Sequence, residues 1–201
     1  MMVATEVLSQ QQLDTIGFNK RCTFANYDRV TTYGQITADR RIAFGCRGSY
    51  GFGSNIRQKF DKNDSDFRLV EETLLRFFPD LRGINFTHAW GGAMGVARSL
   101  HPAIHFDTKS RFGWAGGFFG SGVAATHLAG QTLADLVCGE DSERLTTPWV
   151  NPSYVNRKWE PEPLRWLGVY GSRRLMGVAD YFDYHGAAFV GQALDHVLPN
   201  L

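Results

Sequence analysis

Residues 111 to 139 read RFGWAGGFFGSGVAATHLAGQTLADLVCG, and this stretch predicts a strand, a glycine turn and a helix in direct succession. Residues 111 to 119 are typical of a buried strand. Ser121 can cap the helix that follows, and Gly139 can close its end. The helix carries an apolar stripe at helical spacing, formed by Ala125, Leu128, Ala129, Leu133, Leu136 and Val137. We therefore expect one face of this helix to be buried.

The glycine turn at residues 116–123 is the strongest chemical signal in the sequence. N–H groups at the start of a helix point outward with the positive end of the helix dipole, so they favour an anionic or electron-rich group. Gly120 and Gly122 lack side chains, which lets a flat ligand come within hydrogen-bonding distance of the backbone. The same glycines also fit a tight turn that packs a helix on a sheet. The residues alone leave both interpretations open.

The region before this turn predicts strands and one helix. Residues 27–46 indicate a hairpin with a short polar turn at residues 38–40, and a glycine loop that carries Tyr50 and Phe52 follows it. Residues 84–90 alternate apolar and polar side chains as a strand does. A helix is expected from Asp64 to Phe78, with apolar side chains at Phe67, Val70, Leu74, Phe77 and Phe78.

The region after Gly139 has a different character. Residues 141–163 contain four prolines and indicate an extended segment, and two helices are expected near 164–180 and 186–198. The fold class that follows is α+β, a mixed and mainly antiparallel sheet with flanking helices and a C-terminal helical tail. We divide the chain into residues 1–140, with the sheet and the glycine-led helix, and residues 141–201, with the extended segment and the tail.

Composition excludes several classes of function. The 201 residues carry 21 Lys and Arg against 20 Asp and Glu, so no global positive field is present to attract nucleic acid or an anionic membrane. No run of 18 apolar residues predicts a membrane span, and the N-terminus has no signal-peptide pattern, so we expect a cytoplasmic protein. Three widely spaced cysteines do not form a disulfide framework or a thiolate zinc site. His101 and His105 have Pro102 between them, which disrupts the helix that i, i+4 metal binding needs, and no metal is expected.

A search for phosphate-binding fingerprints finds none. Gly51-x-Gly53 is followed by Ile56, and Gly120-x-Gly122 is followed by Ala125, so neither completes G-x-G-x-x-G. No G-x-x-x-x-G-K-[ST] segment occurs either. This chain by itself supplies no standard cradle for a pyrophosphate.

Several segments, in the same order, resemble the C-terminal part of the D-amino-acid-oxidase-like FAD-dependent oxidoreductases. Residues 4–9 (ATEVLS) resemble the family's "ATEPLS", and residues 37–45 (TADRRIAFG) resemble its "T-x-D-G-R-I-x-F-G" hairpin. Residues 90–92 (WGG) with Pro102 resemble its "W-x-G" strand and "D-x-x-P" turn. Residues 115–123 (AGGFFGSGV) and 128–135 (LAGQTLAD) resemble "G-Y-x-G-x-G-V" and "L-A-G-x-x-L-A-D". Two departures stand out: Arg40 replaces the turn glycine, and Ser99 or Leu100 sits where an acidic residue is usual.

The resemblance implies the substrate domain of a flavin oxidoreductase, with FAD as cofactor and an amine or amino acid as substrate. Hydride leaves the carbon beside the amine for flavin N5, and the resulting imine hydrolyses. The family's FAD domain, with its G-x-G-x-x-G helix, would lie upstream of Met1 or on another chain, so we expect this chain alone to be inactive and not to retain FAD. Residues 159–166 (WEPEPLRW) resemble the bacterial γ-glutamylputrescine-type branch of the family.

The resemblance also suggests roles for particular residues. The glycine turn would approach the pyrimidine carbonyl of the flavin, and Arg47, Tyr50 and Phe52 would contact the substrate. Arg47 fits a solvated loop arginine equally well, and Tyr50 and Phe52 fit aromatic core packing equally well. No catalytic residue is assigned. The expected cofactor-binding residues are Trp90, Gly91, Gly117, Phe118, Gly120, Ser121, Gly122 and Val123.

Two other functions stay open at this point: a non-catalytic binding module and one subunit of a heteromeric oxidase. If the FAD domain is absent, apolar surface around Trp114, Phe118 and Phe119 is left in water. We therefore expect a homo-oligomer whose contact includes those aromatics or residues 159–166.

Overall fold

The computed structural model describes residues 1–18, 20–46, 48, 50–120 and 122–196, and these residues form two compact units. The first unit holds residues 1–93 together with the described part of the chain from Glu162 onward. The second unit holds residues 94–161. Each unit is described by itself. The boundary at residue 140, which the sequence suggested, stays a prediction.

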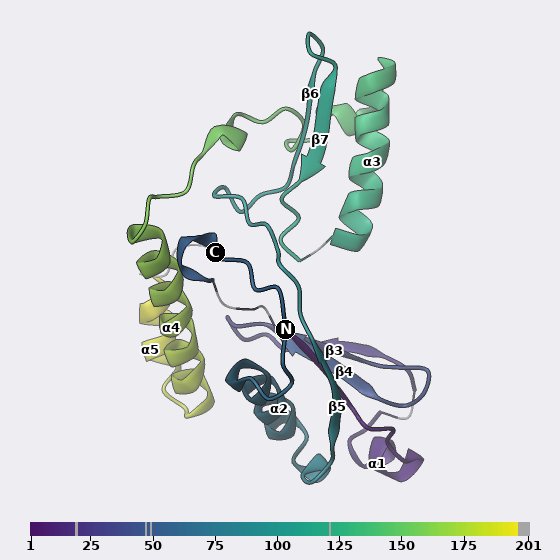
Figure 1. Ribbon diagram of the computed structural model, residues 1–201, viewed down its shortest axis with the longest axis vertical. Coiled ribbons are helices and arrows are strands. Elements are labelled where there is room, and N and C mark those ends of the chain that lie inside the picture. Colours follow the sequence, from purple (N-terminus) through teal and green to yellow (C-terminus); the bar gives the residue numbers. More distant parts are fainter. Residues whose placement is uncertain (19, 47, 49, 121, 197–201) are drawn as a thin grey trace. The chain divides into compact units, whose positions relative to one another are not determined.

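A five-stranded antiparallel sheet is the centre of the first unit (Figure 1). Its order is β2 (Thr23–Ala25), β3 (Thr32–Ile36), β4 (Ile42–Cys46), β1 (Met2–Thr5) and β5 (Phe86–Trp90). The register places Val3 opposite both Phe44 and Ala89. The N-terminal strand therefore lies inside the sheet, between two strands that come from later in the chain.

Helix α2 (Ser65–Phe77) packs on β1 and β4 and closes the core. Phe67, Val70 and Leu74 are buried, at the spacing that places them on one helix face. They meet Val3, Ile42 and Phe44 in one hydrophobic cluster. Each such side chain stabilises the fold by roughly 1.5–3 kcal/mol relative to leaving it in water. Two short elements, α1 (Gln10–Thr15) and η2 (Pro79–Leu81), lie at the edge of this core and contact each other.

The turn between β3 and β4 has a left-handed residue. Thr37 N–H donates to Arg41 O at 2.9 Å, and Arg40 N–H donates to Thr37 O at 3.1 Å. Arg40 has φ of 64°, a conformation that glycine adopts without steric cost. Arg40 therefore stands at the position where the family's motif has glycine, and it adopts the glycine-like conformation.

The C-terminal tail is a helical hairpin of α4 (Leu164–Tyr184) and α5 (Ala188–Asp195), whose helices lie against each other (Figure 1). Arg29, in the loop between β2 and β3, holds both helices. Its guanidinium pairs with Asp180 at 3.1 Å, Asp183 at 2.6 Å and Asp195 at 2.6 Å. Val30 N–H also donates to Asp180 at 3.2 Å, and the Tyr184 hydroxyl donates to Asp28 at 2.9 Å, so the β2–β3 loop holds the tail at several points.

The second unit is a two-stranded hairpin covered by a helix (Figure 1). Strand β6 (Ala103–Asp107) pairs with β7 (Phe112–Gly116), and α3 (Gly122–Cys138) packs on both. Two short helices, η3 (Glu143–Thr146) and η4 (Ser153–Asn156), follow. Residue 150 extends the sheet by a bridge to Ile104.

The α+β class with mainly antiparallel sheets, flanking helices and a helical tail is confirmed. The predicted helix at 64–78, the hairpin and the strand–turn–helix succession are all present. Three details differ from the sequence expectation. Residues 27–31 form a loop around Arg29 and not a strand, α1 and β2 were not foreseen, and short 3₁₀ turns interrupt the extended segment 141–163.

Candidate functional site

The glycine turn connects β7 to α3 as predicted. Gly117 has φ of 78° and Gly120 has φ of 95°, so both occupy conformations that disfavour other residues. A Cβ on Gly117 would lie 2.9 Å from His101 O, which makes this glycine a packing requirement. Ser121 lies outside the described residues, so its capping role stays a prediction.

The start of α3 is open to an approaching ligand. A Cβ on Gly120 or on Gly122 would meet no atom within 4 Å, and Val123 is 94% exposed. The first N–H groups of a helix have no partner within that helix. For a 17-residue helix, the dipole adds a positive partial charge at this end. The arrangement fits the electron-rich edge of a flat ring, as a flavin has.

Gly91 has a different physical explanation. Its Cβ would lie 2.6 Å from Cε1 of Phe60, so the absent side chain makes room for an aromatic ring of the same unit. Trp90, at the end of β5, is 43% exposed. Phe118 lies in the turn before α3 and is half-buried. The predicted cofactor residues thus fall on two separate units, Trp90 and Gly91 on the first and the glycine turn on the second.

Tyr50 and Phe52, the predicted substrate residues, belong to a loop that docks on the start of α4. The Tyr50 hydroxyl donates to Glu162 Oε1 at 2.7 Å, and Gly53 N–H donates to the same oxygen at 3.0 Å. Phe52 meets Trp166 edge to face, with ring centroids 6.4 Å apart. The loop is therefore attached to α4 by one carboxylate and one aromatic pair. Arg47 lies outside the described residues, and its predicted contact with a substrate carboxylate stays a prediction.

Glu162 also accepts hydrogen bonds from two residues of α4, which the sequence did not predict. Arg165 Nη2 donates to Oε1 at 3.0 Å, and Trp166 N–H donates to Oε2 at 3.0 Å. Partial desolvation acts to raise the pKa of Glu162. The hydrogen bonds from Tyr50, Gly53, Arg165 and Trp166 outweigh it and lower that pKa to about 2. The group is a carboxylate at every physiological pH.

Glu162, Arg165 and Trp166 were not assigned to a site from the sequence. The one available signal was their place at the start of an expected helix, where an acidic group is favourable. Tyr50 and Gly53, the loop partners of Glu162, are 112 and 109 positions earlier in the chain, and no local pattern joins the two segments.

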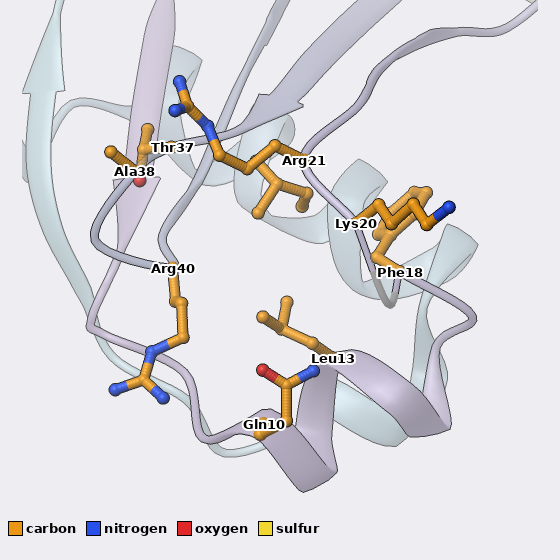
Figure 2. A pocket seen from close by; sticks show the side chains of 9 residues that line it. Gln10, Leu13, Phe18, Lys20, Arg21, Thr37, Ala38 and Arg40 are labelled. Carbon is orange, nitrogen blue, oxygen red and sulfur yellow. The ribbon is translucent and has the colours of Figure 1, made fainter.

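A hollow of about 100 Å³ lies on the first unit, between α1 and the β3–β4 turn (Figure 2). Its lining includes Leu13, Phe18 and Ile36, with Lys20, Arg21 and Arg40 at the rim. Figure 2 shows the guanidinium of Arg40 and the ammonium of Lys20 directed away from Leu13. Ligand sites have a few convergent polar groups, and this hollow does not bring its charges together.

Two kinds of feature are missing from the described part of the chain. No three His, Cys, Asp or Glu side chains there are grouped so that they could hold a metal ion. Nor does any helix there have the length and apolar character to cross a membrane. His101 packs beside Tyr154, and His105 packs beside Trp114.

Some of the aromatic residues expected at an oligomer contact have partners within the chain. Trp159 Nε1 donates to Val96 O at 2.8 Å, and Trp166 stacks on Tyr170. Self-association stays a prediction.

Comparison with known proteins gives a consistent result. Gamma-glutamylputrescine oxidoreductase of Escherichia coli (strain K12) is 32% identical over 145 residues, which are 71% of this chain and 31% of the relative. Probable oxidoreductase OrdL of Haemophilus influenzae (strain ATCC 51907 / DSM 11121 / KW20 / Rd) is 29% identical over 147 residues, 72% of this chain and 30% of the relative. The chain thus spans about a third of the length of these relatives. No solved structure matches it.

The family model described as FAD dependent oxidoreductase (DAO) matches residues 1–136. This range covers the whole antiparallel sheet, the glycine turn and nearly all of α3. The chain therefore belongs to the FAD dependent oxidoreductase family.

Proposed function

We propose that this chain forms the part of an FAD-dependent oxidoreductase that faces the substrate and the reactive ring of FAD. The complete enzyme would oxidise an amine or amino acid to an imine. The observation that carries the proposal is the helix start at Gly120 and Gly122, where a Cβ would meet no atom within 4 Å. Family membership supplies the identity of the cofactor.

FAD, when bound, supplies the acceptor for the hydride that leaves the carbon beside the amine. The contribution of this chain is placement. The first N–H groups of α3 would stabilise negative charge at the ring edge. Tyr50 and Phe52 would exclude water from the amine, and Arg47 would pair with a substrate carboxylate. The name of the Escherichia coli relative makes γ-glutamylated amines the first substrates to test.

A binding module without catalysis and a subunit of a heteromeric oxidase are the alternatives. Both the enzyme proposal and the subunit proposal need an FAD-binding region upstream of this segment or on another chain, because no G-x-G-x-x-G segment occurs here. Genomic sequence beside this segment discriminates between them.

The test begins with the colour of the purified chain. Alone, it should be colourless, and a preparation with one bound flavin per chain contradicts the proposal that this chain does not retain FAD. Joined to or co-expressed with the FAD-binding region, it should yield a yellow protein whose flavin absorbance is lost on anaerobic addition of a γ-glutamylated amine. No bleaching with any amine or amino acid would refute the oxidoreductase proposal.

A variant connects the result to the site. Gly122→Val places a branched side chain at the open start of α3. We expect slower flavin reduction or weaker flavin binding with little change in the stability of the chain. Gly130→Val, at another open glycine of the same helix, is the matched control and should leave the flavin unaffected. Equal flavin kinetics in folded Gly122→Val protein would remove this turn from the site.

A further inference from the structure

Glu162 stands two residues before the start of α4, and its carboxylate joins two segments that lie far apart in the chain. Its side chain is 18% exposed. Four groups donate to it: the Tyr50 hydroxyl, the Gly53 amide, the Arg165 guanidinium and the Trp166 amide. Tyr50, Gly53 and Arg165 all donate to Oε1, and Trp166 N–H donates to Oε2. The carboxylate is therefore bonded to the loop and to the start of α4 at the same time.

The hydroxyl of Tyr50 uses its proton and accepts a hydrogen bond within the same loop and helix start. Its one proton goes to Glu162, and its oxygen accepts from Ser54 N–H at 3.0 Å. The Arg165 guanidinium lies 5.4 Å from the centre of the Tyr50 ring. The ring is therefore held by both its hydroxyl and its face, and the hydroxyl has no proton left to donate to a ligand.

Phe52 differs from Tyr50 in being exposed. Its side chain is 59% exposed and contacts Trp166 by an edge. Trp166 in turn stacks on Tyr170 at 4.9 Å. The loop therefore presents the Phe52 ring outward while Tyr50 faces the carboxylate of Glu162.

From these contacts we propose that Glu162 is a positioning residue, which fixes the loop of residues 50–54 on α4 so that Phe52 and not the Tyr50 hydroxyl faces the substrate. Arg165 assists by holding the Tyr50 ring. The inference deepens the proposed function, because it rests on the assignment of this loop to the substrate side.

Amide hydrogen exchange of the 201-residue chain tests the anchoring without any flavin. The Gly53 and Trp166 amides both donate to Glu162, so they report on the carboxylate from both sides. Hydrogen bonds to charged groups are strong enough that Glu162→Ala should speed exchange at both amides by about tenfold or more. Glu162→Gln keeps an acceptor oxygen and should give an intermediate increase. Amides of β3 and β4 should exchange as in the unmodified chain, which separates a local effect from general destabilisation.

Glu160→Gln is the matched control, since Glu160 lies two residues away and pairs with Arg98 in the other unit. It should leave Gly53 and Trp166 unchanged. Tyr50→Phe keeps the acceptor of both amides, so it should speed exchange at Gly53 by less than Glu162→Ala does and leave Trp166 near its unmodified rate. Unchanged exchange at both amides in Glu162→Ala overturns the proposal.

The link to the substrate is measured separately in the flavin-loaded protein, with γ-glutamylputrescine as the probe. Glu162→Ala should raise KM by about tenfold, with kcat retained within about twofold, because the loop positions substrate and does not take part in the chemistry. A loosened loop with unchanged KM refutes the assignment of the loop to the substrate side, while the anchoring by Glu162 remains supported. Loss of kcat with unchanged KM would contradict a positioning role.

Discussion

Arg40→Gly should stabilise the protein, against the usual direction of substitutions to glycine. Arg40 has φ of 64° in the turn that joins β3 to β4. A left-handed conformation costs a residue other than glycine roughly 1–2 kcal/mol. Its backbone bonds, from its own N–H to Thr37 O and from Leu8 N–H to its carbonyl, do not depend on the side chain. Figure 2 shows the guanidinium directed away from Leu13, so little packing is lost.

The gain is reduced by the greater freedom of glycine in the unfolded chain, about 0.4–1 kcal/mol. The net expectation is a rise of about 0.5–1 kcal/mol in the free energy of unfolding, or a few degrees in Tm for a chain of this length. Urea denaturation followed by circular dichroism measures it.

Arg82→Gly is the matched control, because Arg82 is also exposed but has φ of −59°. There the change should destabilise the protein by about 0.4–1 kcal/mol, since no strain is relieved. Equal losses in the two variants would refute the account of strain at Arg40.

Two further predictions concern the packing role of one glycine and the attachment of the tail. Gly91→Ala should lower the free energy of unfolding in the absence of any flavin, because the new Cβ would lie 2.6 Å from the Phe60 ring. An unchanged free energy of unfolding in urea denaturation would contradict the packing account and favour a cofactor role for Gly91. Hydrogen bonding to Arg29 holds the pKa of Asp195 below its usual value of 3.8, so the stability that this pair contributes is present above about pH 4 and is lost as the pH falls through the lowered pKa. Protection of the α5 amides, the ratio of intrinsic to observed exchange rate at each pH, should therefore fall below pH 4, while protection of Gly53 is kept until the pH approaches the value of about 2 at which Glu162 takes up a proton. Equal protection of α5 at pH 6 and pH 3 would show that the Arg29 network does not hold the tail.

The order of the elements could be predicted from the sequence wherever a local pattern has one physical solution. Apolar spacing at Phe67, Val70 and Leu74 allowed only a helix with one buried face, and the structure buries all three. The glycine-led start of α3 was equally predictable, because glycines between a strand and a helix mark a tight turn whatever the ligand. Loop residues 27–31 were wrongly included in a strand, because their β-forming composition does not reveal that Arg29 binds three aspartates more than 150 positions away.

For the predicted site residues, the sequence indicated the chemistry of each side chain but not which residues it contacts. It marked Tyr50 and Phe52 as one aromatic pair with the same role, and the structure separates them, one ring held by Glu162 and the other exposed. It marked Gly91 and Gly122 as equivalent glycines, whereas Phe60 fills the space beside the first and nothing fills the space beside the second.

The sequence by itself therefore determined the family, the succession of strands and helices and the glycine turn at the start of α3, because each depends on residues close together in the chain. Only the tertiary structure decided which glycine is needed for packing, which aromatic ring faces outward and which carboxylate is occupied. These depend on contacts between segments such as residues 50–54 and 162–166, and a one-dimensional pattern contains no information about which distant donors will meet a given acceptor.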